Sequence, residues 1–361
     1  MNYFPVMLFL LGRDRGFGVG AIGDSGSSWG GDLGRHGGAT PTGLFMGWVW
    51  DMVTVVVPAT TANLGPGFDC LGAALGLYNR FQFSLLPTGE KAVVIEATGL
   101  EADLVARDES NLAYRAFAYF YQQIGQAPPP VHLAIALEVP LARGLGSSAT
   151  AIVGGLLGAN ALAGSPVSQD RVMEMAIALE GHPDNVVPAL IGGCRLSASG
   201  SAISKESGWT ICEVPWHSDI VPIVAIPNFE LSTAEARRVL PQSYSRADAI
   251  FNMAHLGLLL RGLETGRADW LSTALQDRIH QPYRQQLIRG YEAVQKGAIA
   301  AGAYGMVISG AGPTLLALSH KEQATEVEAA MAIAWTEEGI DVQAQVLQLD
   351  TTGAVISGIS V

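Results

Sequence analysis

The sequence predicts an α+β fold, because strand-like and helix-like stretches follow one another without the strict alternation of a doubly wound parallel sheet. The composition suits a packed globular protein, since hydrophobic residues make up 49% and charged residues 15% of the chain. The length of 361 residues allows two domains, because a single domain averages roughly 100–200 residues.

Residues 1–51 are dense in Gly and Ser and show neither a helical nor a strand period, so we expect an extension that is disordered or not native. Met52 directly precedes a strand-like run, which suggests the hypothesis that translation begins there. The apolar run Val6–Leu11 is too short to span a bilayer and lacks a basic region before it, so a signal peptide is not expected.

The regular pattern starts with a strand at Thr54–Pro58, followed by a Gly- and Pro-rich loop at Thr60–Gly72. Strands are predicted next at Phe81–Leu86 and Ala92–Glu96, where β-branched and aromatic residues are frequent. The turn-forming residues Pro87–Gly89 between these two strands favour a hairpin.

A helix is expected at Asn111–Ile124, starting after the capping residue Ser110, and a strand at Val131–Leu137. The segment Ala149–Leu162 is rich in Ala, Gly and Leu, which predicts a buried helix whose small residues allow neighbours to approach closely. A shorter helix at Arg171–Leu179 follows. Later strands are predicted at Val221–Ile226, on either side of the sequence SGAGPT and, as the last strand of the chain, at Gln343–Leu347. Later helices are predicted at Ser232–Val239, Ala247–Leu263, Leu287–Ala301 and Glu322–Glu338.

The charge and the cysteines limit the classes of function. With 33 acidic and 21 basic residues the formal net charge is -12, which argues against general binding to nucleic acid or anionic membranes. Cys70, Cys194 and Cys212 lie far apart and form no CxxC pair, which argues against a disulfide framework or a zinc site. We therefore expect a cytoplasmic location.

The stretch PLARGLGSSA, between a predicted strand and the small-residue helix, indicates an anion site. Gly144 and Gly146 allow the backbone to come close to an anion, and the amides at the following helix N-terminus attract phosphate oxygens. The hydroxyls of Ser147 and Ser148 suit phosphate or Mg²⁺. The pattern is neither a Walker A nor a dinucleotide-binding fingerprint, and alone it fits a simple helix cap equally well.

Three stretches resemble, in order and spacing, the motifs of the GHMP kinase superfamily: PATTANLGPGFDCLG at Pro58–Gly72, PLARGLGSSATA at Pro140–Ala151 and ISGAGPTLLAL at Ile308–Leu318. Three others are similar to the homoserine kinases of that superfamily. They are EGHPDNVVPALIGG from Glu180, LSTAEARRVLP from Leu231 and DRIHQPYR from Asp277.

This resemblance implies a two-domain α+β kinase. Its N-terminal domain would be similar to ribosomal protein S5 domain 2 and its C-terminal domain ferredoxin-like. We expect an ATP-binding domain at residues 52–212 and a second domain at residues 213–361, with ATP and acceptor meeting between them.

By resemblance the protein binds ATP, with the phosphates on the second motif and the adenine near Asn111. Ser148 would share Mg²⁺ with a downstream glutamate, which is Glu180 or, if the connection is longer, Glu174. The residues expected to hold ATP besides Asn111 are Pro140, Leu141, Ala142, Arg143, Gly144, Leu145, Gly146, Ser147, Ser148 and Ala149.

The acceptor implied by the resemblance is L-homoserine, phosphorylated to O-phospho-L-homoserine in threonine biosynthesis. Arg237 and Arg284 would bind its carboxylate, a role that suits the planar guanidinium fork. The residues expected around its ammonium and hydroxyl groups are Asn63, Asp69, His182, Asp184 and Asn185. Ser148, Glu180 and Asp184 are the expected catalytic residues, and Asp184 either accepts the hydroxyl proton or only binds the substrate.

The sequence leaves two alternatives open. Another GHMP kinase, such as a mevalonate kinase, would share the three Gly-rich motifs, although mevalonate has no ammonium group. A non-catalytic ligand-binding protein of the same fold would have to lack phosphate or Mg²⁺ contacts. Because relatives of this kind often form dimers, a homodimer is also expected.

Overall fold

The computed structural model describes residues 52–87, 89, 91–200 and 208–359. All of them belong to one compact unit, Gly47–Val361. The predictions for the extension 1–51 and for the run Val6–Leu11 lie outside the described residues. The described part is a mixture of helices and two sheets, so the predicted α+β class is confirmed.

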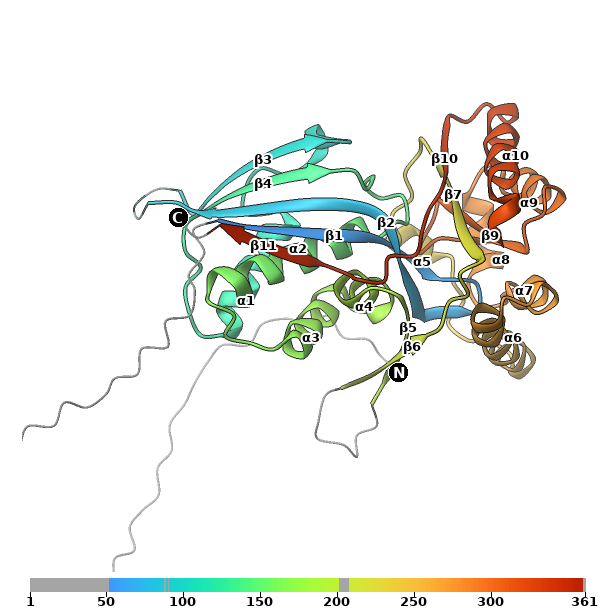
Figure 1. The fold of residues 1–361 in the computed structure, drawn as a ribbon, viewed down its shortest axis with the longest axis horizontal. Coiled ribbons are helices and arrows are strands. Elements are labelled where there is room, and N and C mark those ends of the chain that lie inside the picture. The colour runs from blue at the N-terminus through green and yellow to red at the C-terminus, as the bar shows by residue number, and fades with distance from the viewer. Residues whose placement is uncertain (1–51, 88, 90, 201–207, 360–361) are drawn as a thin grey trace, which may run out of the picture. The chain divides into compact units, whose positions relative to one another are not determined.

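The first sheet has seven strands and is built mainly from the first half of the chain (Figure 1). Its main path runs β11-β1-β2-β4-β3, and β5 pairs with both β2 and β6. Only the β3–β4 pair is parallel. The strands are β1 (Met52–Asn63), β2 (Gly67–Leu85), β3 (Val93–Gly99), β4 (Val131–Leu137), β5 (Cys194–Ser199), β6 (Trp209–Val214) and β11 (Val355–Ile359).

The predicted hairpin around Pro87–Gly89 is wrong. Strands β2 and β3 both exist, but β4 lies between them and pairs antiparallel with β2 and parallel with β3. Alternate residues of β4 are buried along its whole length, as expected where one face of the sheet is covered, whereas the end of β3 is exposed. Strand β3 lies at the end of the main path of the sheet, next to β4 and not next to β2.

The predicted loop at Thr60–Gly72 is also largely wrong, because most of it is strand. Strand β1 continues to Asn63 and β2 begins at Gly67, so only a tight turn separates them. Asn63 (φ 72°), Leu64 (φ 45°) and Gly65 (φ 81°) all adopt left-handed backbone conformations in that turn. A tight reversal of this kind fixes the first motif rigidly at one end of the sheet.

Helices of the first lobe cover one face of this sheet (Figure 1). We use "first lobe" for the first sheet and its four helices, which are α1 (Leu112–Gln123), α2 (Ser147–Leu162), α3 (Gln169–Glu180) and α4 (Pro183–Ile191). A Cβ on Gly154 or Gly158 would lie 2.4 or 2.3 Å from the ring of Phe81 or Phe83, respectively. The small residues predicted in α2 therefore do allow the close packing that was expected.

Two details of these helices differ from the prediction. The cap of α1 is Asn111 and not Ser110, because Asn111 Oδ1 accepts hydrogen bonds from the amides of Ala113 and Tyr114. Helix α4 was not predicted, although Pro183 at its first position is a common helix start. Pro188 inside the helix obscured its period.

The second lobe is a four-stranded antiparallel sheet with the order β10-β7-β9-β8 and its surrounding helices. Its strands are β7 (Ile220–Pro227), β8 (Gly305–Ile308), β9 (Leu315–His320) and β10 (Val342–Val346). Its helices are α5 (Thr233–Arg238), α6 (Arg246–Thr265), α7 (Ala268–Ala274), α8 (Gln281–Arg284), α9 (Tyr291–Ala300) and α10 (Ala324–Glu337). Short 3₁₀ turns occur at Ala102–Leu104, Gln285–Leu287 and Lys321–Gln323.

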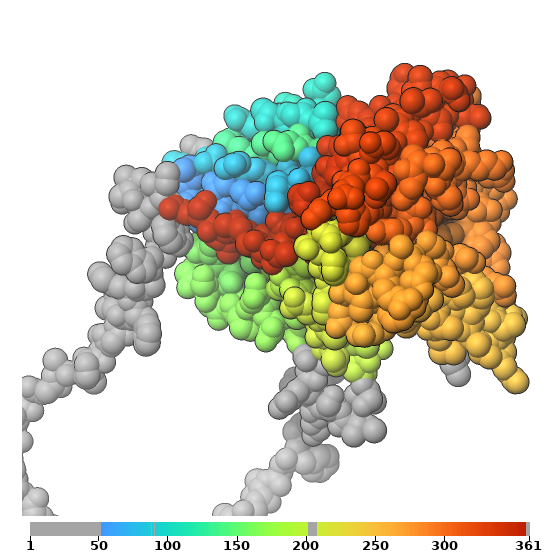
Figure 2. Space-filling view, turned by 45° about the vertical axis from the view of Figure 1, so that its right-hand side comes forward, coloured from blue at the N-terminus to red at the C-terminus, as the bar shows by residue number. Residues whose placement is uncertain are grey.

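The strand predicted at Gln343–Leu347 is present as β10, but the expectation that it is the last strand is wrong. Strand β11 follows it and pairs antiparallel with residues Met52–Val56 of β1. In Figure 2 this red segment runs directly beside the blue strands of the first lobe. The chain thus returns to its first sheet, and the predicted division between residues 212 and 213 stays a prediction.

A buried apolar cluster is shared by the two lobes. It contains Leu64 and Leu71 from the first lobe and Val224, Leu259 and Leu316 from the second. This shared core fixes the β1–β2 turn against the second sheet. Among the described residues, none of the helices combines the length and the apolar character that a membrane crossing requires.

Candidate active site

The three Gly-rich motifs meet at the junction of the two lobes. Asn63 Nδ2, from the β1–β2 turn, donates to Gly310 O at 2.8 Å. Ser309 Oγ lies 2.7 Å from Gly144 O, and Thr60 N donates to Leu145 O at 3.1 Å. The β1–β2 turn, the loop before α2 and the β8–β9 turn therefore support one another through buried hydrogen bonds.

A cavity of about 320 Å³ opens where these motifs meet. It is lined by the loop before α2, the start of α4, helix α5 and the β8–β9 turn. The lining includes most of the residues predicted for the site, namely Asn63, Asp69, Ala142, Gly144, Gly146, Ser147, Ser148, Glu180, His182, Asp184, Asn185, Arg237 and Arg284. The predicted anion loop and both predicted arginines thus face the same space.

The loop before α2 has the backbone geometry of an anion site. Gly144 has φ 77° and Gly146, the N-cap of α2, has φ 68°. A Cβ on Gly144 would lie 2.3 Å from Ser309 O, and one on Gly146 would lie 2.0 Å from Thr60 Oγ1. Only glycine fits at both places, so the first amides of a 16-residue helix are held at the cavity wall.

Ser148 and Glu180 form a pair of oxygen donors beside this helix start. Ser148 Oγ donates a hydrogen bond of 2.7 Å to Glu180 Oε1. Burial raises the pKa of Glu180, although the hydrogen bond from Ser148 and the nearby His182 lower it. A half-buried carboxylate with a hydroxyl oxygen at this distance suits a hard divalent cation such as Mg²⁺.

Glu174, the other candidate, lies outside this cavity. Its carboxylate accepts a hydrogen bond of 2.8 Å from Arg171 Nη1, one helical turn earlier on α3. The side chain of Arg171 is 48% exposed and that of Glu174 is 33% exposed. The geometry favours Glu180 as the residue that faces Ser148.

A second cavity of about 260 Å³ adjoins the same two serines. Its wall is mostly apolar, with Phe81, Val105, Leu137 and Leu112 among the lining residues. Asn111 also lines it, and its side chain holds the local backbone, since Oδ1 caps α1 and Nδ2 donates to Ala106 O. A flat apolar group attached to a phosphate chain on the loop would fit there.

Arg143 lines neither of these cavities, and its assignment to the ATP site stays a prediction. Its guanidinium donates to Glu101 Oε1 at 3.0 Å, to Leu141 O at 2.9 Å and to Pro227 O at 3.2 Å. Glu101 Oε2 also accepts from Leu141 N at 2.6 Å. Arg143 and Pro140 line a separate hollow behind the loop, so the Arg143 side chain holds the loop from outside.

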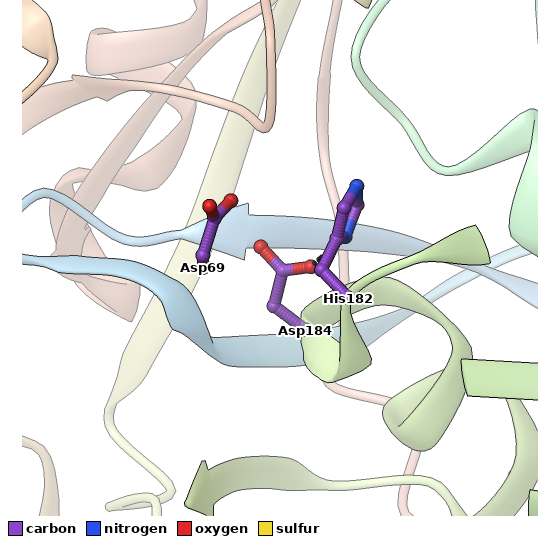
Figure 3. Close-up of side chains that lie close together, drawn as sticks. All are labelled: Asp69, His182 and Asp184. Carbon is purple, nitrogen blue, oxygen red and sulfur yellow. Dashed lines mark hydrogen bonds and ion pairs between the residues drawn. The ribbon is translucent and has the colours of Figure 1, made fainter. Parts of the chain in front are cut away.

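On the acceptor side of the cavity, opposite charges lie close together. Arg237 Nη1 and Nη2 donate to the two carboxylate oxygens of Asp69 at 3.0 and 2.7 Å. His182 Nδ1 lies 2.5 Å from Asp184 Oδ1. Figure 3 shows the side chains of Asp69, His182 and Asp184 close together. One ligand atom of each lies within 4.8 Å of those of the others.

Arg284 contributes a second guanidinium to the same wall. Only 2% of the residue is exposed, and its Nε and Nη1 donate to Ala236 O at 3.1 Å and Gly310 O at 3.0 Å. Burial is the main cause that lowers the pKa of Arg284 to about 10, and repulsion from Arg237 lowers it further in the same direction. It therefore remains protonated at neutral pH and can bind an anion.

The chain is similar in sequence to known proteins. The profile described as "GHMP kinases N terminal domain" matches residues 111–193, and "GHMP kinases C terminal" matches residues 259–337. The homoserine kinase of Trichormus variabilis is 68% identical over 84% of this chain and 98% of its own length. That of Nostoc punctiforme is 66% identical over 84% of this chain and 97% of its own length.

The chain belongs to the homoserine kinase family of GHMP kinases. The crystal structure of homoserine kinase from Cytophaga hutchinsonii agrees, with 28% identity, a TM-score of 0.75 and coverage of 85% of this chain and 98% of that one. A mevalonate kinase from L. major has 14% identity and a TM-score of 0.62, covering 81% of this chain and 95% of its own, so it shares the fold alone. The predicted family and two-domain architecture are confirmed.

The roles of single residues in this homoserine kinase family member stay predictions. Asn63 and Asn185 line the cavity, but both amides are used internally. Asn63 Oδ1 accepts from Asp69 N at 3.0 Å, and Asn185 Oδ1 accepts from Thr60 Oγ1 at 2.8 Å. These two residues therefore position neighbouring motif residues in addition to facing the cavity.

Two lining residues, Ser232 and Thr233 at the start of α5, were missed by sequence reasoning. Their signal was present, because both belong to the stretch LSTAEARRVLP. Of that stretch, only Arg237 had been assigned to the acceptor. Gly310–Gly312, in the β8–β9 turn, also face the cavity, and the family resemblance had implied that this motif borders the site.

Proposed function

We propose that this protein transfers the γ-phosphate of ATP to the side-chain hydroxyl of L-homoserine, producing ADP and O-phospho-L-homoserine. The observation that carries the proposal is a single cavity in which a glycine-rich helix start faces two guanidinium groups and three carboxylates. Such a cavity accommodates a phosphate chain at one end and a zwitterion at the other. Relatives with 58–68% identity are homoserine kinases, which supports the same acceptor.

For ATP, the proposed site comprises both cavities on either side of Ser147 and Ser148. The phosphates would accept hydrogen bonds from the amides at the start of α2, and the adenine would occupy the apolar cavity. Ser148 and Glu180 would hold Mg²⁺, and their oxygen donors and separation of 2.7 Å fit this ion. When bound, Mg²⁺ neutralises charge on the phosphate oxygens.

For homoserine, the proposed site is the Asp69–Arg237 pair together with Arg284. The ion pair of Asp69 and Arg237 contains one negative and one positive group, as the zwitterionic substrate does. An incoming amino acid would place its ammonium beside Asp69 and its carboxylate beside Arg237 and Arg284. A hydroxy acid without the ammonium would leave Asp69 without a cationic partner from the substrate, which disfavours mevalonate as an acceptor.

In the proposed reaction the homoserine hydroxyl oxygen forms a bond to the γ-phosphorus while the bond from that phosphorus to the bridging oxygen of ADP breaks. The hydroxyl proton must leave the oxygen in the same process. Asp184, whose Oδ1 is held by His182, is the predicted acceptor for this proton. An Asp184→Asn variant with wild-type turnover at every pH tested would restrict Asp184 to substrate binding.

The test of the proposal is ADP formation with a panel of acceptors, with and without Mg²⁺. We expect turnover with L-homoserine to exceed that with L-serine, L-threonine and mevalonate by a wide margin, and to require Mg²⁺. Equal or greater turnover with mevalonate would replace the proposed acceptor. Nucleotide binding without turnover of any acceptor would instead support a non-catalytic protein.

We also infer a cytoplasmic role in threonine biosynthesis. Cys70, Cys194 and Cys212 are all free, which suits a reducing compartment. Burial raises the pKa of Cys70 to about 11, so this thiol stays protonated and unreactive at neutral pH. The expected homodimer can be tested by measuring the molar mass in solution.

A further inference from the structure

The aromatic ring of Phe68, in the first motif, contacts both arginines that line the acceptor side of the cavity. The guanidinium carbons of Arg284 and Arg237 lie 5.1 and 5.7 Å from the centroid of this ring. The imidazole of His280 stacks on it, with ring centroids 5.2 Å apart and planes inclined by 24°. One half-buried side chain thus contacts three groups that flank the predicted carboxylate site.

Two guanidinium groups held side by side repel each other, so their positions require compensation. Arg237 is compensated by Asp69, as described above. Within residues 52–87, 89, 91–200 and 208–359, no carboxylate lies at ion-pair distance from Arg284, which has carbonyl partners instead. The face of an aromatic ring attracts a cation through its quadrupole, and this attraction is strongest where water is excluded.

His280 completes the arrangement without adding a positive charge. It is fully buried, and its Nε2 lies 2.9 Å from Gly65 O, so Nε2 carries the hydrogen. Its Nδ1, 3.4 Å from Arg284 Nη1, then presents a lone pair to the guanidinium. Burial lowers the pKa of His280, and this effect outweighs that of the Asp277 carboxylate, which raises it. The ring is therefore neutral at neutral pH.

We propose that Phe68 is a positioning residue that aligns Arg237 and Arg284 so that both bind the same acceptor carboxylate. This inference rests on the proposed function. Phe68 does not itself line the cavity, so it acts through the arginines and not by touching the substrate. It also explains why the first motif contains an aromatic residue directly before Asp69, the partner of Arg237.

The test compares Phe68→Leu and Phe68→Tyr with the wild type. We expect Phe68→Leu to raise KM for L-homoserine about tenfold and to leave KM for ATP within about twofold. Phe68→Tyr keeps the aromatic face and should restore most of the affinity. With L-homoserine amide, which lacks the carboxylate, the wild type and Phe68→Leu should perform alike, because no anion remains for the arginines to bind.

A matched control exists on α6. Phe251 also contacts an arginine and a histidine, with Arg278 Cζ 4.0 Å from its ring centroid and the His255 ring 3.7 Å away, but neither Arg278 nor His255 lines the cavity. Phe251→Leu should leave both KM values unchanged. If Phe68→Leu does not fold, Phe68→Met, whose unbranched side chain adapts to an irregular space, takes its place.

The outcomes separate this inference from the proposed function. Absence of wild-type turnover with L-homoserine would refute the proposed function and this inference together. Normal wild-type turnover, with an unchanged KM for homoserine in Phe68→Leu, would refute the inference alone. An equal rise in KM for homoserine and for its amide would also refute it, because that result indicates a general packing role.

Discussion

At the scale of single residues, the contact between Ser148 and Glu180 makes a direct prediction about the metal. Glu180→Gln keeps the shape of the side chain but removes the charge that attracts Mg²⁺. We expect the Mg²⁺ concentration for half-maximal activity to rise by at least about tenfold, because a neutral amide is a weaker ligand than a carboxylate. The measurement is ADP formation as a function of Mg²⁺ at saturating substrates.

Glu174→Gln is the matched control on the same helix. Its carboxylate pairs with Arg171 at 2.8 Å and faces neither cavity, so its Mg²⁺ dependence should equal that of the wild type. If Glu174→Gln raised the Mg²⁺ concentration for half-maximal activity and Glu180→Gln did not, Glu174 would be the metal ligand.

The pair formed by His182 and Asp184 predicts a pH-dependent stability. Burial alone lowers the pKa of His182, but the hydrogen bond to Asp184 and the carboxylates of Asp184, Glu180 and Asp69 raise it above its usual value of 6.5. A group with a higher pKa in the folded chain holds its proton more tightly there. Its stabilising effect is therefore complete below about pH 6.5 and is lost as pH rises through the raised pKa.

The check is urea unfolding of the wild type and His182→Gln from about pH 5.5 to pH 8.5. The wild type should exceed the variant most in its free energy of unfolding at the acidic end, and the difference should shrink toward the basic end. Taking this difference removes the contribution of groups that titrate in both proteins. A difference that grows with pH would show that His182 is not the proton-binding group.

At the scale of elements, the loop before α2 depends on close approach to the β8–β9 turn. In Gly144→Ala the new Cβ would lie 2.3 Å from Ser309 O, and the residue would keep φ 77°. Gly125→Ala is the control, since Gly125 has φ 71° but no atom within 4 Å of a built Cβ. Both variants bear the left-handed strain of about 1–2 kcal/mol.

We expect Gly144→Ala to lose a further 1–3 kcal/mol or so of unfolding free energy, about the cost of overpacking, and to raise KM for ATP. Chemical denaturation and initial-rate kinetics measure the two effects. Equal destabilisation of both variants would mean that the loop can move away from Ser309, and the rigid anion site would then have to be abandoned.

The same scale shows which structural features can be predicted from local sequence. The strand Val131–Leu137 and the long helix of small residues were predictable, because their periods are set by nearby residues. The partner of β3 was not, since pairing with β4 depends on residues that lie more than thirty positions away. Helix α4 was hidden because Pro188 interrupts its pattern.

The candidate site was predictable to the same extent. The motif loops that line the cavity were found, because their glycines have a local signature. The direction of Arg143 could not be found, since it is decided by Glu101, forty-two positions earlier in the chain. The contacts of Phe68 with Arg237 and Arg284 likewise depend on segments from the other lobe.

At the scale of the whole molecule, the return of β11 to β1 makes the first lobe dependent on the end of the chain. Five residue pairs join Val355–Ile359 to Met52–Val56, and without them one side of β1 would be an open edge. A domain cut out at residues 52–212 would lack this strand. The two lobes are therefore expected to unfold together in one transition.

A chain that ends at Ala354 tests this coupling. Each backbone hydrogen bond contributes about 0.5–1.5 kcal/mol, so losing the ladder should lower Tm by about 5 °C or more. The control is Ile356→Thr, which keeps the strand and changes only a side chain that is 43% exposed, and it should melt near the wild-type temperature. If the shortened chain also kept its wild-type Tm, β11 would be a dispensable addition, and the first lobe would be stable without the end of the chain.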